Sequence, residues 1–108
     1  MELSKGMLGL ILHEKPSGVI LSLRNSKGKY ASVLAKETNC TYTHILKVLN
    51  QLQEFGVVKF KKQGRTKIVE LTEKGVDVAH ELEGLVRQLE KASEEKTRTV
   101  QETTEQQL

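Results

Sequence analysis

The chain has 108 residues, enough for one small domain, and its single cysteine excludes an intrachain disulfide and a cysteine-based metal centre. Residues 1–71 carry 12 Lys+Arg and 5 Asp+Glu whereas residues 72–108 carry 5 and 9, so the net charge of +3 conceals a basic body and an acidic C-terminal part. Such a division is expected when one region of a protein faces a polyanion.

The N-terminal segment contains the one strongly apolar run of the chain, Met7–Leu12. This run is too short to span a bilayer, and residues 13–16 (HEKP) follow it where a signal peptide would have a small-residue cleavage site. We therefore expect a cytoplasmic protein with no membrane partner. Because Gly6 and Gly9 weaken a helix, the run is interpreted as a strand, with a short helix in a subunit interface as the alternative.

The next stretch, residues 16–40, predicts two helices and a turn. Pro16 suits the first turn of a helix that ends at residues 25–28 (NSKG). After a short extended link, Ser32 is expected to cap a second helix of less than two turns over residues 33–38. Asn39 tolerates the left-handed conformation of a sharp turn, in which Cys40 is expected to be the buried residue.

A third helix is predicted from Thr41, its N-cap, to Phe55, with Gly56 placed to end it. One face is apolar at the helical spacing i, i+3, i+4, i+7, through Ile45, Val48, Leu49 and Leu52. The other face carries hydrogen-bonding or cationic side chains and no acid before Glu54: Thr43, His44, Lys47, Asn50 and Gln51. A short helix, a tight turn and a second helix with an outward N-terminus form a helix-turn-helix arrangement.

Residues 57–62 and 66–71 are β-branched and alternating, and residues 63–65 lie between them as a turn, so a β-hairpin is predicted. The hairpin contains five cations before its first acid, Glu70: Lys59, Lys61, Lys62, Arg65 and Lys67. Basic residues cluster in this way in nucleic-acid footprints. The alternative is a charged sheet edge that prevents aggregation, for which Lys is the usual residue.

The last helix is expected to begin after Thr72, its N-cap, with Glu73 in the first turn. Its apolar residues are spaced 4, 3, 4, 3, at Val78, Leu82, Leu85, Leu89 and Ala92. This stripe is typical of helix–helix pairing and predicts a homodimer through residues 73–96, the alternative being that it packs on its own domain. Apolar residues disappear after Ser93, and residues 97–108 are predicted to be a disordered tail.

The order of these elements resembles that of winged helix-turn-helix regulators, most closely the MarR-like and related archaeal and bacterial single-domain families. The resemblance covers residues 30–75 and is carried by four motifs, LAKE at 34–37, NCT at 39–41, LNQLQEFGVV at 49–58 and LTEKG at 71–75. It implies a mainly α fold with a small β-hairpin (α+β), in which residues 1–72 form the DNA-binding domain with its motif at 32–55 and its wing at 57–71.

The resemblance also implies sequence-specific binding of double-stranded DNA by a transcriptional regulator. The second helix of the motif is expected in the major groove, with the basic wing on the backbone or in the minor groove and Arg65 as the candidate for entry there. For each helix residue the alternative is an ordinary solvated face. The positions carried over to this chain are Thr41, Tyr42, Thr43, His44 and Lys47.

Two other functions remain compatible with the sequence, a winged-helix module for protein–protein interaction and a nonspecific architectural chromatin protein. The basic body favours DNA over a protein partner. We expect no enzyme, no cofactor and no metal, because no catalytic arrangement stands out and His13, His44 and His80 are scattered. Cys40 is interpreted as a buried, inert residue in preference to a redox sensor.

Overall fold

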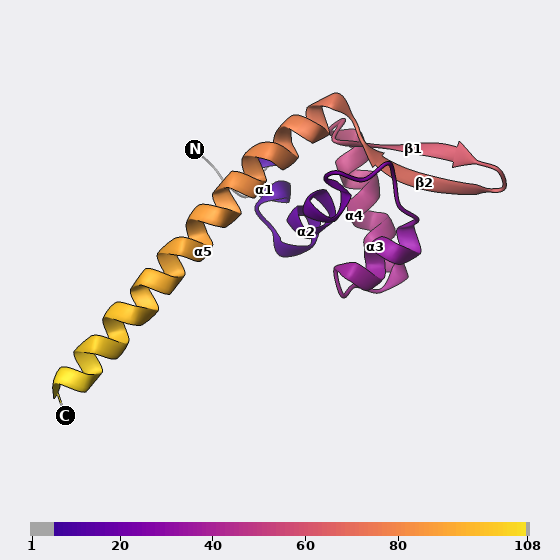
Figure 1. Ribbon diagram of the computed structural model, residues 1–108. Coiled ribbons are helices and arrows are strands. Elements are labelled where there is room, and N and C mark those ends of the chain that lie inside the picture. Colours follow the sequence, from indigo (N-terminus) through magenta and orange to yellow (C-terminus); the bar gives the residue numbers. More distant parts are fainter. Residues whose placement is uncertain (1–5, 108) are drawn as a thin grey trace.

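A computed structural model describes residues 6–107 of the chain, with side chains placed for residues 6–94. A helical body carries two projections, a β-hairpin on one side and a long C-terminal helix on the other (Figure 1). The elements, in chain order, are α1 Gly6–Ile11, α2 Glu14–Leu23, α3 Ala31–Glu37, α4 Tyr42–Glu54, β1 Val58–Gln63, β2 Thr66–Leu71 and α5 Glu73–Gln107.

The core lies where α2, α3 and α4 meet the base of the hairpin, and it is built from aliphatic side chains. Its largest fully buried members are Ile20, Leu23, Leu34, Ile45, Leu49, Leu52, Val19, Val57, Val58 and Val69. Each such side chain contributes about 1.5–3 kcal/mol relative to an exposed position. The apolar face predicted for the third helix is therefore confirmed as the centre of the core.

The turn between α3 and α4 has the predicted conformation. Asn39 has a φ of 55°, in the left-handed region, and the Cys40 amide donates to the Ala35 carbonyl at 2.8 Å. The Thr41 side chain caps α4 by accepting a hydrogen bond from the His44 amide. Cys40 itself is half-buried, less enclosed than the sequence predicted.

The hairpin is antiparallel and pairs Gln63 with Thr66, so Gly64 and Arg65 alone form its turn. Gly64 has a φ of 65°, which favours glycine in such a tight turn. An isolated antiparallel β-bridge joins the segment before α3 to this two-stranded sheet, because Lys29 and Val69 exchange two backbone hydrogen bonds of 2.9 and 2.7 Å. The sequence did not predict this bridge, which fixes the backbone immediately before α3.

The N-terminal strand predicted at residues 7–12 is wrong, because these residues belong to helix α1. Met7, Leu10 and Ile11 pack against the core at the helical spacing i, i+3, i+4. The exposed residues Leu8 and Leu12, which are 39% and 49% accessible, hide this period in the sequence. A helix also satisfies the backbone hydrogen bonds within the segment itself.

Two helix boundaries differ from those predicted. Tyr30, and not Ser32, occupies the N-cap position of α3, because the Lys29 bridge holds extended backbone up to that point. Helix α5 continues to Gln107, whereas the sequence predicted a disordered tail from residue 97. The last part of α5 is rich in Glu and Gln and contains no Gly or Pro, so nothing in its composition interrupts helix propagation. Leu108 and residues 1–5 lie outside the described residues.

The start of α5 confirms the predicted cap and shows why glycine follows it. The Gly75 amide donates to the Thr72 hydroxyl at 3.0 Å, and that hydroxyl also donates to the Gly56 carbonyl. A Cβ atom at Gly75 would lie 2.0 Å from the Val57 carbonyl oxygen, so only glycine permits this approach. The hairpin and α5 are thereby fixed to the end of α4.

Candidate nucleic-acid interface

The exposed face of α4 carries all five residues that the sequence selected on this helix. Thr41, Tyr42, Thr43, His44 and Lys47 are each solvent-exposed, and Tyr42 is 55% accessible. The Thr41 hydroxyl oxygen accepts the His44 amide, which leaves its own proton available to an external acceptor. The N-terminal end of α4 therefore presents donors, and the helix itself carries no acidic side chain before Glu54.

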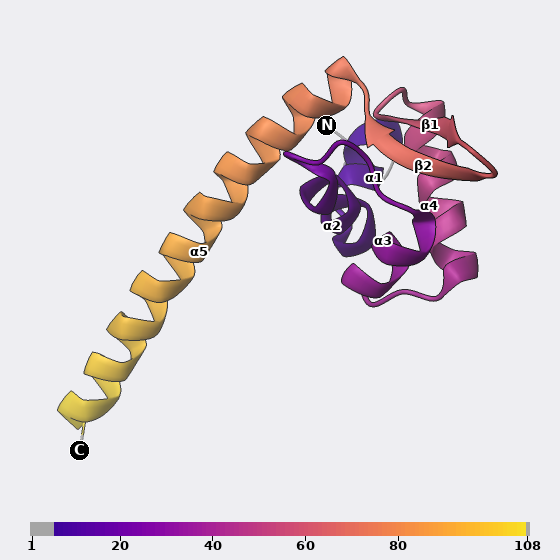
Figure 2. The same ribbon diagram turned by 45° about the vertical axis from the view of Figure 1, so that its right-hand side comes forward.

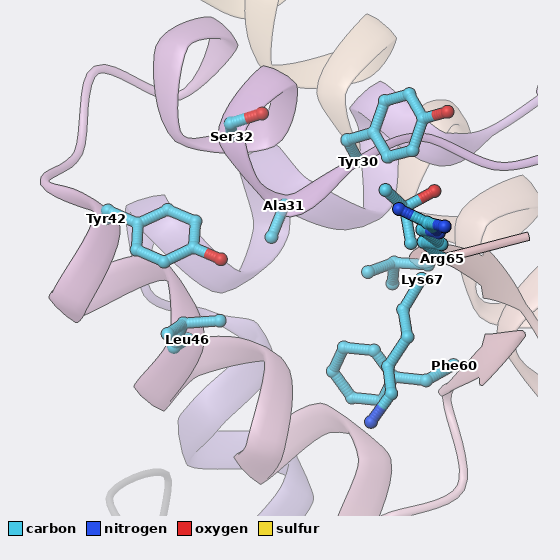
Figure 3. A pocket seen from close by; sticks show the side chains of 10 residues that line it. Tyr30, Ala31, Ser32, Tyr42, Leu46, Phe60, Arg65 and Lys67 are labelled. Atoms are coloured by element: carbon cyan, nitrogen blue, oxygen red, sulfur yellow. The ribbon is translucent and has the colours of Figure 1, made fainter. Parts of the chain in front are cut away.

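Three of these residues line two hollows, one on each side of α4, and Thr41 and Thr43 line neither. A hollow of about 600 Å³, here called the wing groove, lies between the start of α3, α4 and the hairpin (Figure 3). Tyr42 and Leu46 line it from α4. A second hollow, of about 410 Å³, lies on the side of α1 and α2 and is lined by His44, Lys47 and Gln51 from α4.

The wing groove brings together aromatic and cationic side chains from three segments (Figure 3). Tyr30 stands at the start of α3, Tyr42 on α4, and Arg65 and Lys67 on the hairpin, with Phe60 at the base. Tyr30 is 45% accessible, so its ring is available to a ligand. Tyr30 was not among the predicted site residues; its sequence signal is an aromatic residue just before the motif in a chain with only 2 Tyr and 2 Phe.

The five cations of the hairpin do not form one surface. The register places Lys62 opposite Lys67 and Phe60 opposite Val69, on the face of the sheet that borders the wing groove. Alternation along β1 places Lys59 and Lys61 on the other face. Arg65 lies in the turn that joins the strands.

One of these cations is already paired. Lys59 and Glu70 are partners in the register, and their side-chain atoms Nζ and Oε1 lie 3.5 Å apart. Among the ion pairs of the described residues, none involves Lys61, Lys62, Arg65 or Lys67. The wing therefore offers four unpaired cations in the described part of the chain, where the sequence suggested five.

A second lysine beside the hairpin is also neutralised. The Lys29 ammonium donates to both carboxylate oxygens of Glu37, at 2.9 and 3.1 Å. This hydrogen bond lowers the pKa of the Glu37 carboxyl from its ordinary value of 4.5. Lys29 thus stabilises the segment that leads into α3, and its ammonium group is already paired with a carboxylate.

The apolar stripe of α5 divides between the core and the surface. Leu82 is buried in the core of its own domain and Val78 is half-buried against it. Leu85 and Leu89 are 43% and 57% accessible. An apolar hollow of about 360 Å³ between α1 and α5 is lined by Ile11, Leu12, Asp77, Val78, Glu81, Leu82 and Leu85.

The described residues contain neither a cluster of metal-ligating side chains nor a membrane-spanning helix. Within them, no group of three or more His, Cys, Asp or Glu side chains is arranged to hold a metal ion. Within the same residues, no helix combines the length and apolar composition that a membrane span requires.

A family model for the winged helix DNA-binding domain matches residues 19–75. This range contains the second half of α2, both helices of the helix-turn-helix, the hairpin and the start of α5. An uncharacterized protein of Archaeoglobus fulgidus is 26% identical over 57 residues, which cover 53% of this chain and 60% of that relative. The match thus spans about three-fifths of the relative's length.

Solved structures share the fold at low sequence identity. A possible HxlR family transcriptional factor from Thermoplasma volcanium has a TM-score of 0.74 at 20% identity, with 87% of each chain covered. A MarR family transcriptional regulator from Silicibacter pomeroyi has a TM-score of 0.69 at 22% identity, covering 75% of this chain and 59% of that one. Lactococcus lactis ZitR, solved in complex with DNA, has a TM-score of 0.67 at 22% identity, covering 78% and 59%.

Proposed function

The chain belongs to the winged helix DNA-binding domain family, and on this premise we propose that it regulates transcription by binding specific sequences of double-stranded DNA. The observation that carries the proposal is the wing groove. It joins Tyr42, at the tip of α4, to unpaired cations that would hold phosphates, and the residues that would read bases, Thr43 and Lys47, are exposed on the same helix. These two kinds of contact are the ones that specific DNA binding requires together.

In the proposed complex the N-terminal end of α4 enters the major groove. Thr43 and Lys47 are on its exposed face, and a lysine ammonium suits the O6 and N7 acceptors of guanine. His44 reaches the same side as Lys47, because both line the second hollow. Thr41 donates its free hydroxyl proton to a phosphate beside the helix terminus.

The hairpin supplies the contacts to the backbone. Lys62 and Lys67 face the same side as the wing groove and bind the strand that passes between α4 and the hairpin. Arg65, in the exposed turn, enters the adjacent minor groove, where narrow A·T tracts attract arginine. Tyr30 and Tyr42 donate their hydroxyl protons to phosphates of the strand within the groove.

We further propose that the protein acts as a homodimer through α5. Leu85 and Leu89 are exposed on α5, a helix that projects from the body (Figure 2), and Leu12 and Leu85 line the same apolar hollow. Helix-turn-helix domains commonly read paired half-sites as twofold dimers. A second copy of α5 is the partner whose apolar stripe matches this one by symmetry.

A mobility-shift titration on random duplex DNA at about 50 mM and about 200 mM salt tests the DNA proposal. We expect complexes that migrate more slowly than free DNA at low salt, and an affinity for DNA that falls by orders of magnitude at high salt. The double variant Lys62→Met/Lys67→Met should lose most of this binding, while Lys27→Met, at an exposed loop position away from both hollows, serves as the control. Absence of a complex at low salt would favour the protein–protein module instead.

A further inference from the structure

A lysine from α2 is bound to the turn of the helix-turn-helix. The Lys15 ammonium donates to the Thr38 carbonyl at 2.6 Å and to the Asn39 carbonyl at 3.2 Å. Both carbonyls lie between the end of α3 and the start of α4. This contact links residues 23 and 24 positions apart, and periodicity in the sequence does not reveal it.

The electrostatics of the turn favour a cation at this place. Thr38 is the C-cap of α3, where carbonyl groups without helical partners carry the negative end of the helix dipole. The left-handed Asn39 then reverses the chain, so that its carbonyl meets the same ammonium as that of Thr38. The Lys15 side chain is 28% accessible and its acidic neighbour, Glu14, is 4.0 Å away and 89% accessible, so the turn is the stronger partner.

Helix α2 also passes close to the turn one helical turn further along. A Cβ atom added at Gly18 would lie 3.4 Å from the Thr38 side-chain methyl group, so the backbone of α2 is within the length of one small side chain of the turn. The Thr38 hydroxyl donates to the Leu34 carbonyl at 2.7 Å, which fixes that methyl group toward α2. The start of α2 is therefore attached to the turn through Lys15 and lies close to it at Gly18.

The other end of α4 is held in a similar way. The Lys74 ammonium, from α5, donates at 3.1 Å to the carbonyl of Phe55, the C-cap of α4. Lys74 is exposed, and Thr72 also contacts this end, so it is the less critical of the two lysines. At the N-terminal end, Lys15 is the ammonium that bonds to the turn preceding α4.

We propose that Lys15 is a positioning residue for the recognition helix: its bonds to Thr38 and Asn39 set the direction in which α4 leaves the turn. This inference rests on the proposed binding of DNA by α4. Because its ammonium is used by the turn, Lys15 acts on DNA affinity without neutralising a phosphate. Small changes in helix direction displace Thr43 and Lys47 from their contacts, which require defined geometry.

The test compares Lys15→Met with Lys15→Arg and with the exposed control Lys27→Met. DNA affinity is measured by fluorescence anisotropy over a series of salt concentrations. Amide hydrogen exchange of Asn39, Cys40 and the core residue Leu49 is measured on the free proteins. We expect Lys15→Met to lose about tenfold in affinity with an unchanged salt slope, and to exchange the Asn39 and Cys40 amides about tenfold faster. Lys15→Arg, which keeps the donors, should stay within about threefold of wild type.

Several results would overturn the inference. A salt slope that is smaller by about one would make Lys15 a phosphate contact. If Lys15→Met keeps the wild-type affinity for DNA and its Leu49 amide also exchanges faster, Lys15 contributes to the stability of the fold only. If Lys15→Met does not fold, Lys15→Gln is measured in its place. The same loss of DNA affinity and the same faster exchange at Asn39 and Cys40 are expected, each smaller in magnitude.

The exchange measurement separates this inference from the proposed function. If the wild-type protein binds no DNA but the Asn39 and Cys40 amides lose protection in Lys15→Met, the function is wrong and the attachment of the turn stands. If wild type binds DNA and neither measurement changes in Lys15→Met, the positioning role is wrong and the function stands.

Discussion

Lys59 and Glu70 face each other across the hairpin, and the ion pair between them removes one of the wing's five cations from the surface that DNA would meet. We expect the charge-neutral double variant Lys59→Met/Glu70→Gln to keep wild-type affinity and salt slope, since it changes no net charge. Lys67→Met should reduce the slope by about 0.9. If Lys59→Met/Glu70→Gln and Lys67→Met lose DNA affinity equally, the groove-side face of the hairpin is not the face that binds DNA.

The three wing cations assigned to DNA, Lys62, Arg65 and Lys67, set the salt dependence of binding. Neutralisation of three phosphates by them predicts a slope of log K against log salt near −2.7 for each protomer, and roughly double that for a dimer. A titration between about 50 and 200 mM salt measures it. A slope near zero would exclude the wing as a backbone contact.

The two exposed tyrosines of the wing groove give a prediction of a different kind. Tyr30→Phe and Tyr42→Phe each remove one hydroxyl donor and no charge, so each should weaken binding about three- to tenfold with an unchanged salt slope. Both rings are exposed, so the variants should unfold in urea at the wild-type midpoint. Wild-type affinity in both variants would mean that the DNA strand does not run through the groove.

The stripe on α5 predicts that its exposed and buried residues respond differently. Leu85→Asp/Leu89→Asp should convert a dimer to a folded monomer, because both side chains are exposed in one copy of the chain. Leu82→Asp should unfold the domain, since Leu82 is 8% accessible within the core. Val76→Asp, 56% accessible and off the stripe, is the matched control. Light scattering that shows an unchanged dimer mass for the Leu85/Leu89 variant would exclude α5 as the interface.

The Lys29–Glu37 pair predicts a small sensitivity to acid. The pKa of Glu37 is lowered in the folded protein, so its stabilising contribution is present above the unfolded value of 4.5 and is lost as the pH falls through the folded pKa. Because the carboxylate is partly exposed, the contribution is expected to be no more than about 1 kcal/mol. Urea unfolding at neutral and strongly acidic pH should show a smaller difference for Glu37→Gln than for wild type; an equal difference would exclude the pair as its source.

The elements with a clean period were predictable from the sequence. In α4, Ile45 and Leu49 follow the helical spacing, and Asn39 and Gly56 mark its two ends through their backbone conformations. Helix α1 was not predictable in this way, because the exposed residues Leu8 and Leu12 complete an apolar run that conceals the packed face.

The composition of the site depended on register and on distant contacts. A turn over residues 63–65 would not pair Lys59 with Glu70, whereas the observed turn of Gly64 and Arg65 places them opposite each other. The approach of Tyr30 to the wing groove follows from the bridge between Lys29 and Val69, which lies outside any local pattern. Local spacing thus gives the elements, and the tertiary arrangement decides which side chains meet.

Selection of preferred duplexes from a random DNA pool tests the central claim most directly. The full-length protein should enrich a defined sequence, with two related half-sites if it binds as a dimer, and should bind it about 10³-fold more tightly than unrelated DNA or better. Substitutions at Thr43 and Lys47 should alter the sequence that is enriched. Binding to all duplexes with equal affinity would instead identify a nonspecific architectural protein, and would contradict the reading of bases by α4.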